Sequence, residues 1–199
     1  MTTTVRDLPS RYGAVAMTLH WLIAAAIIVN LYLGLTAGDL PHGDPSKMQM
    51  MWWHKSIGFL VLTLSVLRLV WRLVHPVPPS PKALPPLIRF AGLAAHVALY
   101  VLIITVPLAG WLMVSSGSQG HGTSFFGLFD WPAVPVLTSL PRSAAHPWHE
   151  TFESAHVVLA WAMLILVPLH VLAGLYHHFI RKDNVLLRML PGTKLRSGV

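Results

Sequence analysis

Several histidines lie within an apolar stretch at residues 153–180 that is long enough to cross a bilayer. An ionisable side chain in such a segment usually faces the interior of a helix bundle and marks a functional site. His156 and His170 are 14 positions apart, which places their imidazoles about 40° apart on one helix face and roughly 21 Å apart along the axis. This spacing predicts two cofactor sites stacked through a membrane, with one helix contributing a ligand to each.

Two other apolar segments carry one candidate partner each, His20 near the start of residues 14–37 and His54 near the start of residues 52–74. If successive segments cross in opposite directions, His20 lies towards the same surface as His170. His54 then lies towards the other surface, with His156. Four imidazoles at two depths are the ligands that two b-type haems need, one on either side of each iron. A lone interhelical hydrogen bond is the alternative for His20 and for His54.

Other histidines compete for these roles. His149 precedes His156 by seven positions and shares its face if the helix begins early. It is 21 positions from His170, roughly 31 Å along a helix and nearly the whole hydrocarbon thickness. We therefore rank His149 below His156 as the outer ligand. His96 is expected to form hydrogen bonds beside a haem, and four histidines are expected in loops: His42, His75, His121 and His146.

His177 follows His170 by seven positions, on nearly the same face and roughly 10 Å closer to the inner surface. Lys82 lies in the proline-rich stretch that joins the second and third apolar segments. Together they could donate hydrogen bonds to a quinone, or a proton to its reduced form. The alternative, that both are solvated surface groups, carries at least equal weight.

The composition indicates the elements that must position these residues. The 199-residue chain is 54% hydrophobic and only 11% charged, which excludes an ordinary soluble domain. Apolar segments of spanning length are expected at about residues 14–37, 52–74, 92–115 and 153–180, which predicts an all-α integral membrane four-helix bundle. We expect one domain over residues 1–199. The chain has no cysteine, so disulfides, iron–sulfur clusters and covalently attached haem are excluded.

The basic residues predict the orientation in the membrane. With both termini and the proline-rich loop on the cytoplasmic side, 11 of the 14 Lys and Arg residues lie there, including Arg68 and Arg72, which are expected to extend towards the interface. This asymmetry follows the positive-inside rule. Topology therefore explains the net charge of +7 without nucleic acid as a partner. We expect a multi-pass membrane protein, surrounded by lipid.

Five sequence segments resemble the bacterial cytochrome b561 family: TLHW (18–21), WWHKSIG (52–58), HVALYVLIITVPLAGW (96–111), SAH (154–156) and LHVLAGLYHHFIRKDNVLLRML (169–190). The resemblance implies a four-helix membrane cytochrome with two b haems, ligated by His20, His54, His156 and His170. A close match within that family is the superoxide oxidase type, which also implies the inner membrane of a bacterium. It therefore implies oxidation of superoxide at the outer face and transfer of the electrons to ubiquinone. WHE at 148–150 resembles a motif that carries the ligand in relatives, which keeps His149 as a rival of His156.

The charges give mixed support for superoxide as the donor. Lys55 follows His54 and could attract an anion, but the outer loops carry five carboxylates against three basic residues. One alternative is a membrane-anchor cytochrome that exchanges electrons between quinol and a partner dehydrogenase or hydrogenase. Another is a histidine-lined metal transporter, which would be colourless and would be expected to carry more carboxylates within its spans.

Overall fold

Four long helices dominate the computed structural model, which describes residues 10–79, 85–118 and 121–196. They are α1 (Ala14–Asp39), α2 (Pro45–Val74), α3 (Pro86–Gly117) and α5 (Arg142–Tyr176). A π-helical turn, η2 (His177–Arg181), continues α5, and a short 3-10 helix, η3 (Leu187–Met189), follows. All four long helices are long and apolar enough to cross a membrane, which confirms the expected all-α class.

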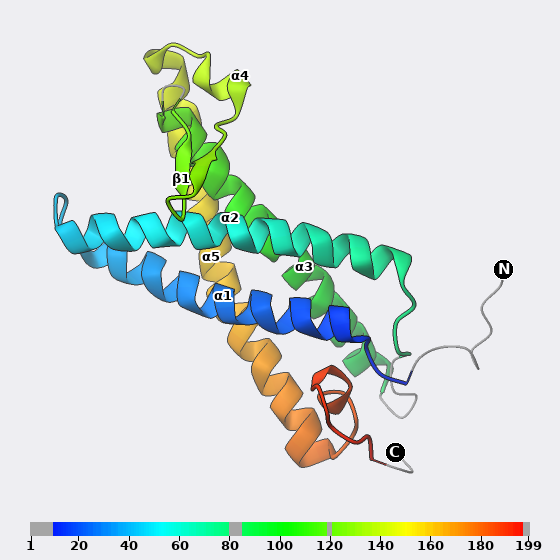
Figure 1. Ribbon diagram of the computed structural model, residues 1–199. Helices are drawn as coiled ribbons and strands as arrows, with labels where there is room; N and C mark the ends of the chain where they lie inside the picture. Colours follow the sequence, from blue (N-terminus) through cyan, green and yellow to red (C-terminus); the bar gives the residue numbers. More distant parts are fainter. Residues whose placement is uncertain (1–9, 80–84, 119–120, 197–199) are drawn as a thin grey trace.

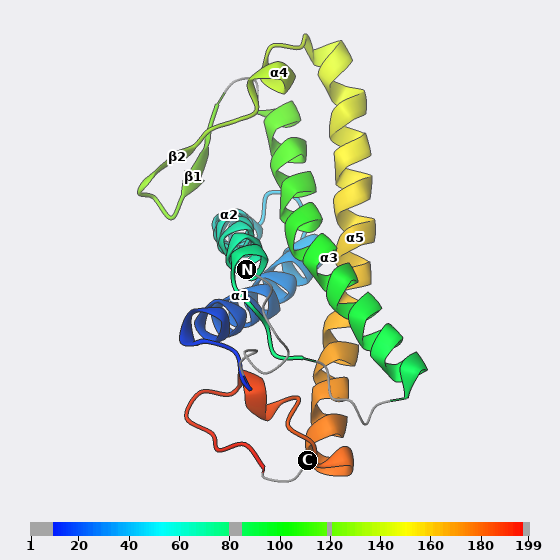
Figure 2. The same ribbon diagram turned by 90° about the vertical axis from the view of Figure 1, so that its right-hand side faces the viewer.

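The helices associate as two pairs. α1 packs along α2, α3 packs along α5, and α2 joins the pairs through α3. The pairs cross at a steep angle (Figure 1), so that Figure 2 shows α1 and α2 nearly end-on while α3 and α5 run lengthwise. Each pair therefore presents one side to the other pair, and the histidines of α1 and α2 face those of α5 across this interface.

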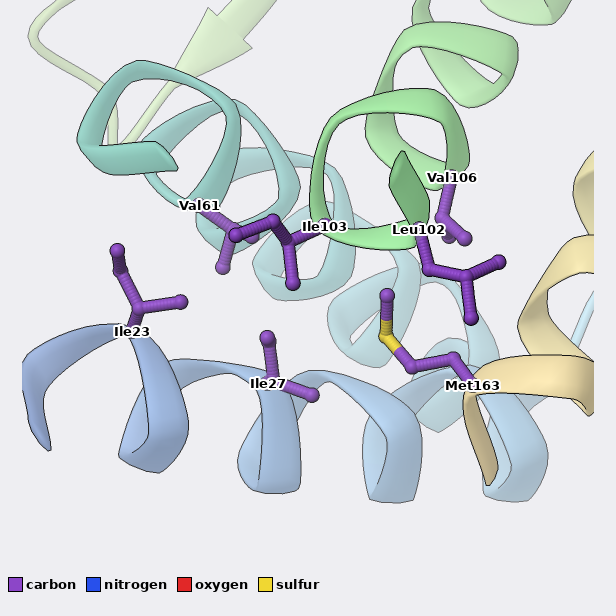
Figure 3. Packing of buried hydrophobic residues seen from close by; sticks show 7 residues of the cluster. All are labelled: Ile23, Ile27, Val61, Leu102, Ile103, Val106 and Met163. Atoms are coloured by element: carbon purple, nitrogen blue, oxygen red, sulfur yellow. The ribbon is translucent and has the colours of Figure 1, made fainter. Parts of the chain in front are cut away.

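An apolar cluster lies where the two pairs cross (Figure 3). Met163 of α5 is seven residues from His156 and seven from His170, so the cluster lies about halfway between those two histidines. Its buried members come from all four long helices: Ile23, Ile27, Val61, Leu102, Ile103, Val106 and Met163. This apolar layer separates two polar levels within the helical interior.

The C-terminal segment folds back beneath the start of α1. The Arg11 guanidinium donates to the Leu190 carbonyl at 2.6 Å, and the Trp21 indole donates to the Met189 carbonyl at 2.8 Å. Residues 11–21 and 187–193 therefore lie on one side of the bundle. This arrangement agrees with the prediction that both termini share a membrane side.

A two-stranded hairpin packs on the first half of α2, away from the side on which residues 11–21 and 187–193 lie. Strands β1 (Thr123–Phe125) and β2 (Phe129–Trp131) pair antiparallel, and the four-residue helix α4 (Pro135–Thr138) follows them. Ser56 of α2 is fully buried beneath the hairpin: its hydroxyl donates to the Ser124 carbonyl at 3.2 Å and accepts from the Phe126 N–H at 3.1 Å. The polar hairpin backbone is thus attached to an otherwise apolar helix.

The expected start of the fourth span was wrong by eleven residues. α5 begins at Arg142 rather than 153, so His146 lies in a helix and not in a loop. The first turn closes on Pro141, whose carbonyl accepts from the Ala145 N–H at 3.0 Å. Pro147 lies inside α5. Because proline has no N–H, it removes one backbone hydrogen bond there, but the helix continues past it.

The second and third helices also begin earlier than expected, at Pro45 rather than 52 and at Pro86 rather than 92. Proline is well suited to the first position of a helix, where its missing N–H is not needed. Asp44 caps α2 by accepting from the Ser46 N–H at 2.7 Å. The first turn of α2 is polar and so lay outside the apolar pattern, whereas the first turn of α3 directly follows the proline-rich stretch.

Candidate haem sites

His54 of α2 and His156 of α5 form the outer histidine pair. Their ring centroids are 6.0 Å apart and the rings are nearly perpendicular, at 88°. Nδ1 of His54 lies 3.0 Å from the Asn30 carbonyl, and Nδ1 of His156 lies 2.9 Å from the Val106 carbonyl. Since a carbonyl only accepts, each Nδ1 carries the proton and each Nε2 is left free to bind a metal.

Two glycines make room for these rings. A Cβ at Gly34 of α1 would lie 2.8 Å from Cε1 of His54. A Cβ at Gly110 of α3 would lie 3.1 Å from Cε1 and Nδ1 of His156. The ring of each outer histidine therefore rests against the backbone of a neighbouring helix.

His20 of α1 and His170 of α5 form the inner histidine pair, with ring centroids 6.3 Å apart and an interplanar angle of 78°. A third imidazole, that of His96 on α3, has its centroid 5.4 Å from that of His170. Nδ1 of His96 donates to the Gly92 carbonyl at 2.6 Å. The inner level thus brings three imidazoles together, whereas the outer pair has two.

Both pairs have the centroid spacing expected of two imidazoles that bind one iron atom. An imidazole nitrogen binds a transition metal at about 2 Å, so two rings on opposite sides of one iron have centroids about 6 Å apart. Both pairs meet this requirement more closely than His96 and His170 do. No group of three or more His, Cys, Asp or Glu side chains suited to a metal occurs in the described residues. Two imidazoles alone suit a haem, because the porphyrin supplies the other four ligands.

His149 is held in the same manner as His156, two helical turns further out. Its Nδ1 lies 2.9 Å from the Met113 carbonyl, and a Cβ at Gly117 would lie 3.3 Å from its ring. However, within the described ranges no other imidazole is in ring contact with His149. The ring opposite His54 is that of His156. The geometry therefore favours His156 over His149 as the outer ligand.

Arg68, which was expected to extend towards the inner interface, contacts both α1 and α3. Its guanidinium donates to the Ala16 carbonyl of α1 at 2.8 Å and lies 5.8 Å from the ring centroid of Tyr100 on α3. It is half-buried and within electrostatic reach of His20 and His170, whereas Arg72 is exposed. Arg68 therefore faces the inner pair, because α1 and α3 both offer it a partner.

His177 lies at the end of α5 and has a partner that sequence reasoning missed. Its Nδ1 is 2.6 Å from a carboxylate oxygen of Asp183, which also lies 3.6 Å from Nε of Arg181. The side chains of His177 and Asp183 are only 14% and 10% exposed, so His177 is not a solvated surface group. The sequence signal for this pairing was Asp183, a single carboxylate within the basic C-terminal tail. Lys82 lies outside the described residues, so the expected pairing with His177 stays a prediction.

An apolar groove of about 480 Å³ opens between α2 and α3 beside the inner pair. Its polar lining includes His96, Arg72 and Thr105, and most of the remaining lining is aliphatic. His96 therefore lies between this groove and His170.

Comparison with known proteins identifies the family. A profile of prokaryotic cytochrome b561 matches residues 11–192. The chain belongs to this family. It is 35% identical over 191 residues to cytochrome b561 homolog 2 of Escherichia coli K12, covering 96% of this chain and 97% of that one. It is 29% identical to a probable superoxide oxidase CybB of Yersinia pestis (91% and 96% covered) and 27% identical to cytochrome b562 of Cereibacter sphaeroides (90% and 94%).

Membership in the cytochrome b561 family assigns the general role of the chain. It is a multi-pass membrane protein that binds haem b and transfers electrons. Two pairs of histidines lie within the four-helix arrangement at ring spacings that suit haem ligation. The identity of the donor and acceptor is a separate question, because the relatives carry different names.

Proposed function

We propose that the whole chain is one di-haem unit of a bacterial inner membrane that transfers electrons from superoxide at the outer face to ubiquinone at the inner face. The observation that carries this proposal is the presence of two histidine pairs with ring centroids 6.0 and 6.3 Å apart, at opposite ends of an apolar layer. When bound, each haem supplies an iron that cycles between the ferric and ferrous states. The placement of 11 of 14 basic residues on one side supports the orientation.

The proposed axial ligands are His54 and His156 for the outer haem and His20 and His170 for the inner haem. The Asn30 and Val106 carbonyls orient the outer imidazoles, as second-shell acceptors do for histidine ligands of metals. The apolar cluster around Met163 excludes water between the two levels.

Superoxide as the donor is supported by one relative and one residue. A probable superoxide oxidase is 29% identical over 182 residues. Lys55 lies within electrostatic reach of His54 and places a cation beside the outer pair. Two superoxide anions that each lose one electron to form dioxygen would together supply the two electrons that reduce one quinone.

The quinone needs two protons as well as two electrons, and His177 is the proposed donor of one of them. The Asp183 carboxylate accepts a hydrogen bond from Nδ1–H of His177, which fixes the ring. In its doubly protonated form the ring then offers its Nε2–H proton to the reduced quinone, and water at the inner surface supplies the replacement proton and the second proton of the quinol. Lys82 is proposed as the second polar contact.

Rapid mixing tests the proposed donor. The purified chain, with its haems oxidised, is mixed with a pulse of superoxide, and haem reduction is followed by absorbance with and without a soluble ubiquinone analogue. We expect rapid reduction without the quinone and rapid reoxidation with it. Superoxide dismutase added beforehand should abolish the signal. Haems that stay oxidised under superoxide but are reduced by quinol would instead support the membrane-anchor cytochrome.

Haem content tests the ligand assignment. His170→Ala should remove one of two haems, seen as loss of about half of the haem absorbance per chain. His149→Ala is the matched control on the same helix and should keep both haems. An unchanged spectrum in His170→Ala would refute the assignment of the inner site.

A further inference from the structure

Arg68 is a cation within a membrane-spanning helix, on the side that faces the other helices. One guanidinium nitrogen donates to the Ala16 carbonyl at 2.8 Å, and the group lies 5.8 Å from the ring centroid of Tyr100. A guanidinium has five N–H donors, so this backbone contact leaves most of its donors available. The charge is within electrostatic reach of both inner imidazoles, His20 and His170.

The described part of the chain provides no anion for Arg68. Its carboxylates that form ion pairs are Glu150, which pairs with His146, and Asp183, which pairs with His177 and Arg181. Five of the chain's seven carboxylates belong to the outer end, away from the inner pair. Charged side chains within membrane spans are usually paired or line a functional cavity, because an unpaired charge is costly there. Asp7, the other carboxylate of the inner end, lies outside the described residues. Within the described residues, the inner site is the place where an anion would meet Arg68.

We infer that Arg68 binds a carboxylate of the inner haem and raises the reduction potential of that haem. Haem b carries two propionate groups, which are carboxylates, and arginine is the side chain best suited to bind a carboxylate through two parallel hydrogen bonds. This inference rests on the proposed function, in that it needs a haem between His20 and His170.

The direction of the effect follows from charge. Reduction adds one electron to the haem, so a nearby cation stabilises the reduced form more than the oxidised form. The part-buried setting between α1 and α3 reduces screening by water and salt. Removal of the cation should therefore make the inner haem harder to reduce. The outer haem, on the far side of the apolar cluster, should respond much less.

Potentiometric titration of the purified di-haem protein, followed by absorbance, tests this inference. Arg68→Gln removes the charge and Arg68→Lys keeps it. Arg89→Gln is the matched control, because Arg89 carries the same charge at the inner end of α3 but is exposed. The inner wave is identified as the one that disappears in His20→Ala.

In Arg68→Gln we expect the reduced-to-oxidised ratio of the inner haem, at a fixed potential, to fall at least about tenfold, a shift of about 59 mV for a one-electron couple. Arg68→Lys should keep most of the wild-type potential, and Arg89→Gln and the outer wave should change little. Loss of the inner haem in Arg68→Gln but not in Arg68→Lys would also support the pairing.

An unchanged inner wave in Arg68→Gln, with both haems still bound, would overturn the inference. Loss of the inner haem in both Arg68→Gln and Arg68→Lys would also overturn the inference. Haem binding would then depend on the shape of the arginine side chain and not on its charge. Neither result concerns the proposed function, which instead fails if the wild-type chain binds no haem or only one.

Discussion

The outer and inner histidine pairs are similar in ring spacing but are held by different means. Each outer imidazole is bonded to a backbone carbonyl of a neighbouring helix and rests against a glycine. In the residues that the structure describes, neither His20 nor His170 forms a hydrogen bond through its ring. Instead, the inner pair has a third imidazole and the Arg68 cation close by.

This contrast indicates that the two sites are adapted to different demands. Backbone carbonyls and glycines cannot move without moving a helix, so they fix the outer rings in one position. Side chains such as Arg68 and His96 change the charge and polarity of a site without fixing the rings. The outer site is therefore defined mainly by geometry, and the inner site mainly by electrostatics.

The largest effect should come from filling the space beside an outer ring. In Gly34→Val, the new side chain begins at a Cβ only 2.8 Å from Cε1 of His54, so the ring must move away from its position opposite His156. We expect loss of the outer haem and retention of the inner haem, measured as about half of the haem per chain in the reduced-minus-oxidised spectrum.

Gly38→Val is the control for this substitution, since Gly38 lies on the same helix and a Cβ there meets nothing within 4 Å. It should keep both haems. If Gly34→Val also keeps both haems, or loses the inner one, the outer rings are not held in place by the glycine. The proposed difference between the outer and inner sites would then be wrong.

Much of this architecture could be predicted from the sequence because depth in a membrane is encoded by length and hydropathy. The 14-residue spacing of His156 and His170, together with alternating helix direction, pointed to the ring partners that the structure brings together. The family profile confirms the recognition of the family. The ligand assignment itself stays a prediction until haem is measured.

Other features could not be predicted, because they depend on contacts between residues distant in the sequence. The inward orientation of Arg68 depends on a carbonyl 52 residues away. The β hairpin depends on Ser56, which bonds to residues 68 and 70 positions later. The polar first turns of α2 and α5 lie outside any apolar pattern, so helix starts were placed too late.

A smaller effect should follow from loosening the hairpin that covers the outer half of α2. Ser56→Ala removes a buried hydroxyl and leaves the Phe126 N–H without its acceptor and the Ser124 carbonyl without its donor, at a cost of about 1–3 kcal/mol. We expect hydrogen exchange across residues 123–131 to become about five- to 150-fold faster, with little change near the inner pair.

Ser139→Ala provides the comparison for Ser56→Ala. Its exposed hydroxyl donates to the Val136 carbonyl, within one turn, so exchange in the hairpin should not change. Equal acceleration at the inner helix ends in Ser56→Ala would show that the hairpin stabilises the whole bundle and not the outer half alone.

The smallest effect should come from His96, because its ring is close to His170 without the spacing of an axial pair. The centroids of His96 and His170 are 5.4 Å apart, compared with 6.3 Å for His20 and His170. We expect His96→Gln to keep both haems and to shift the inner absorption band slightly, whereas His20→Gln should lose the inner haem. The reverse result would make His96 the ligand opposite His170. In that case His20, near Arg68, would contribute only to the polarity of the inner site.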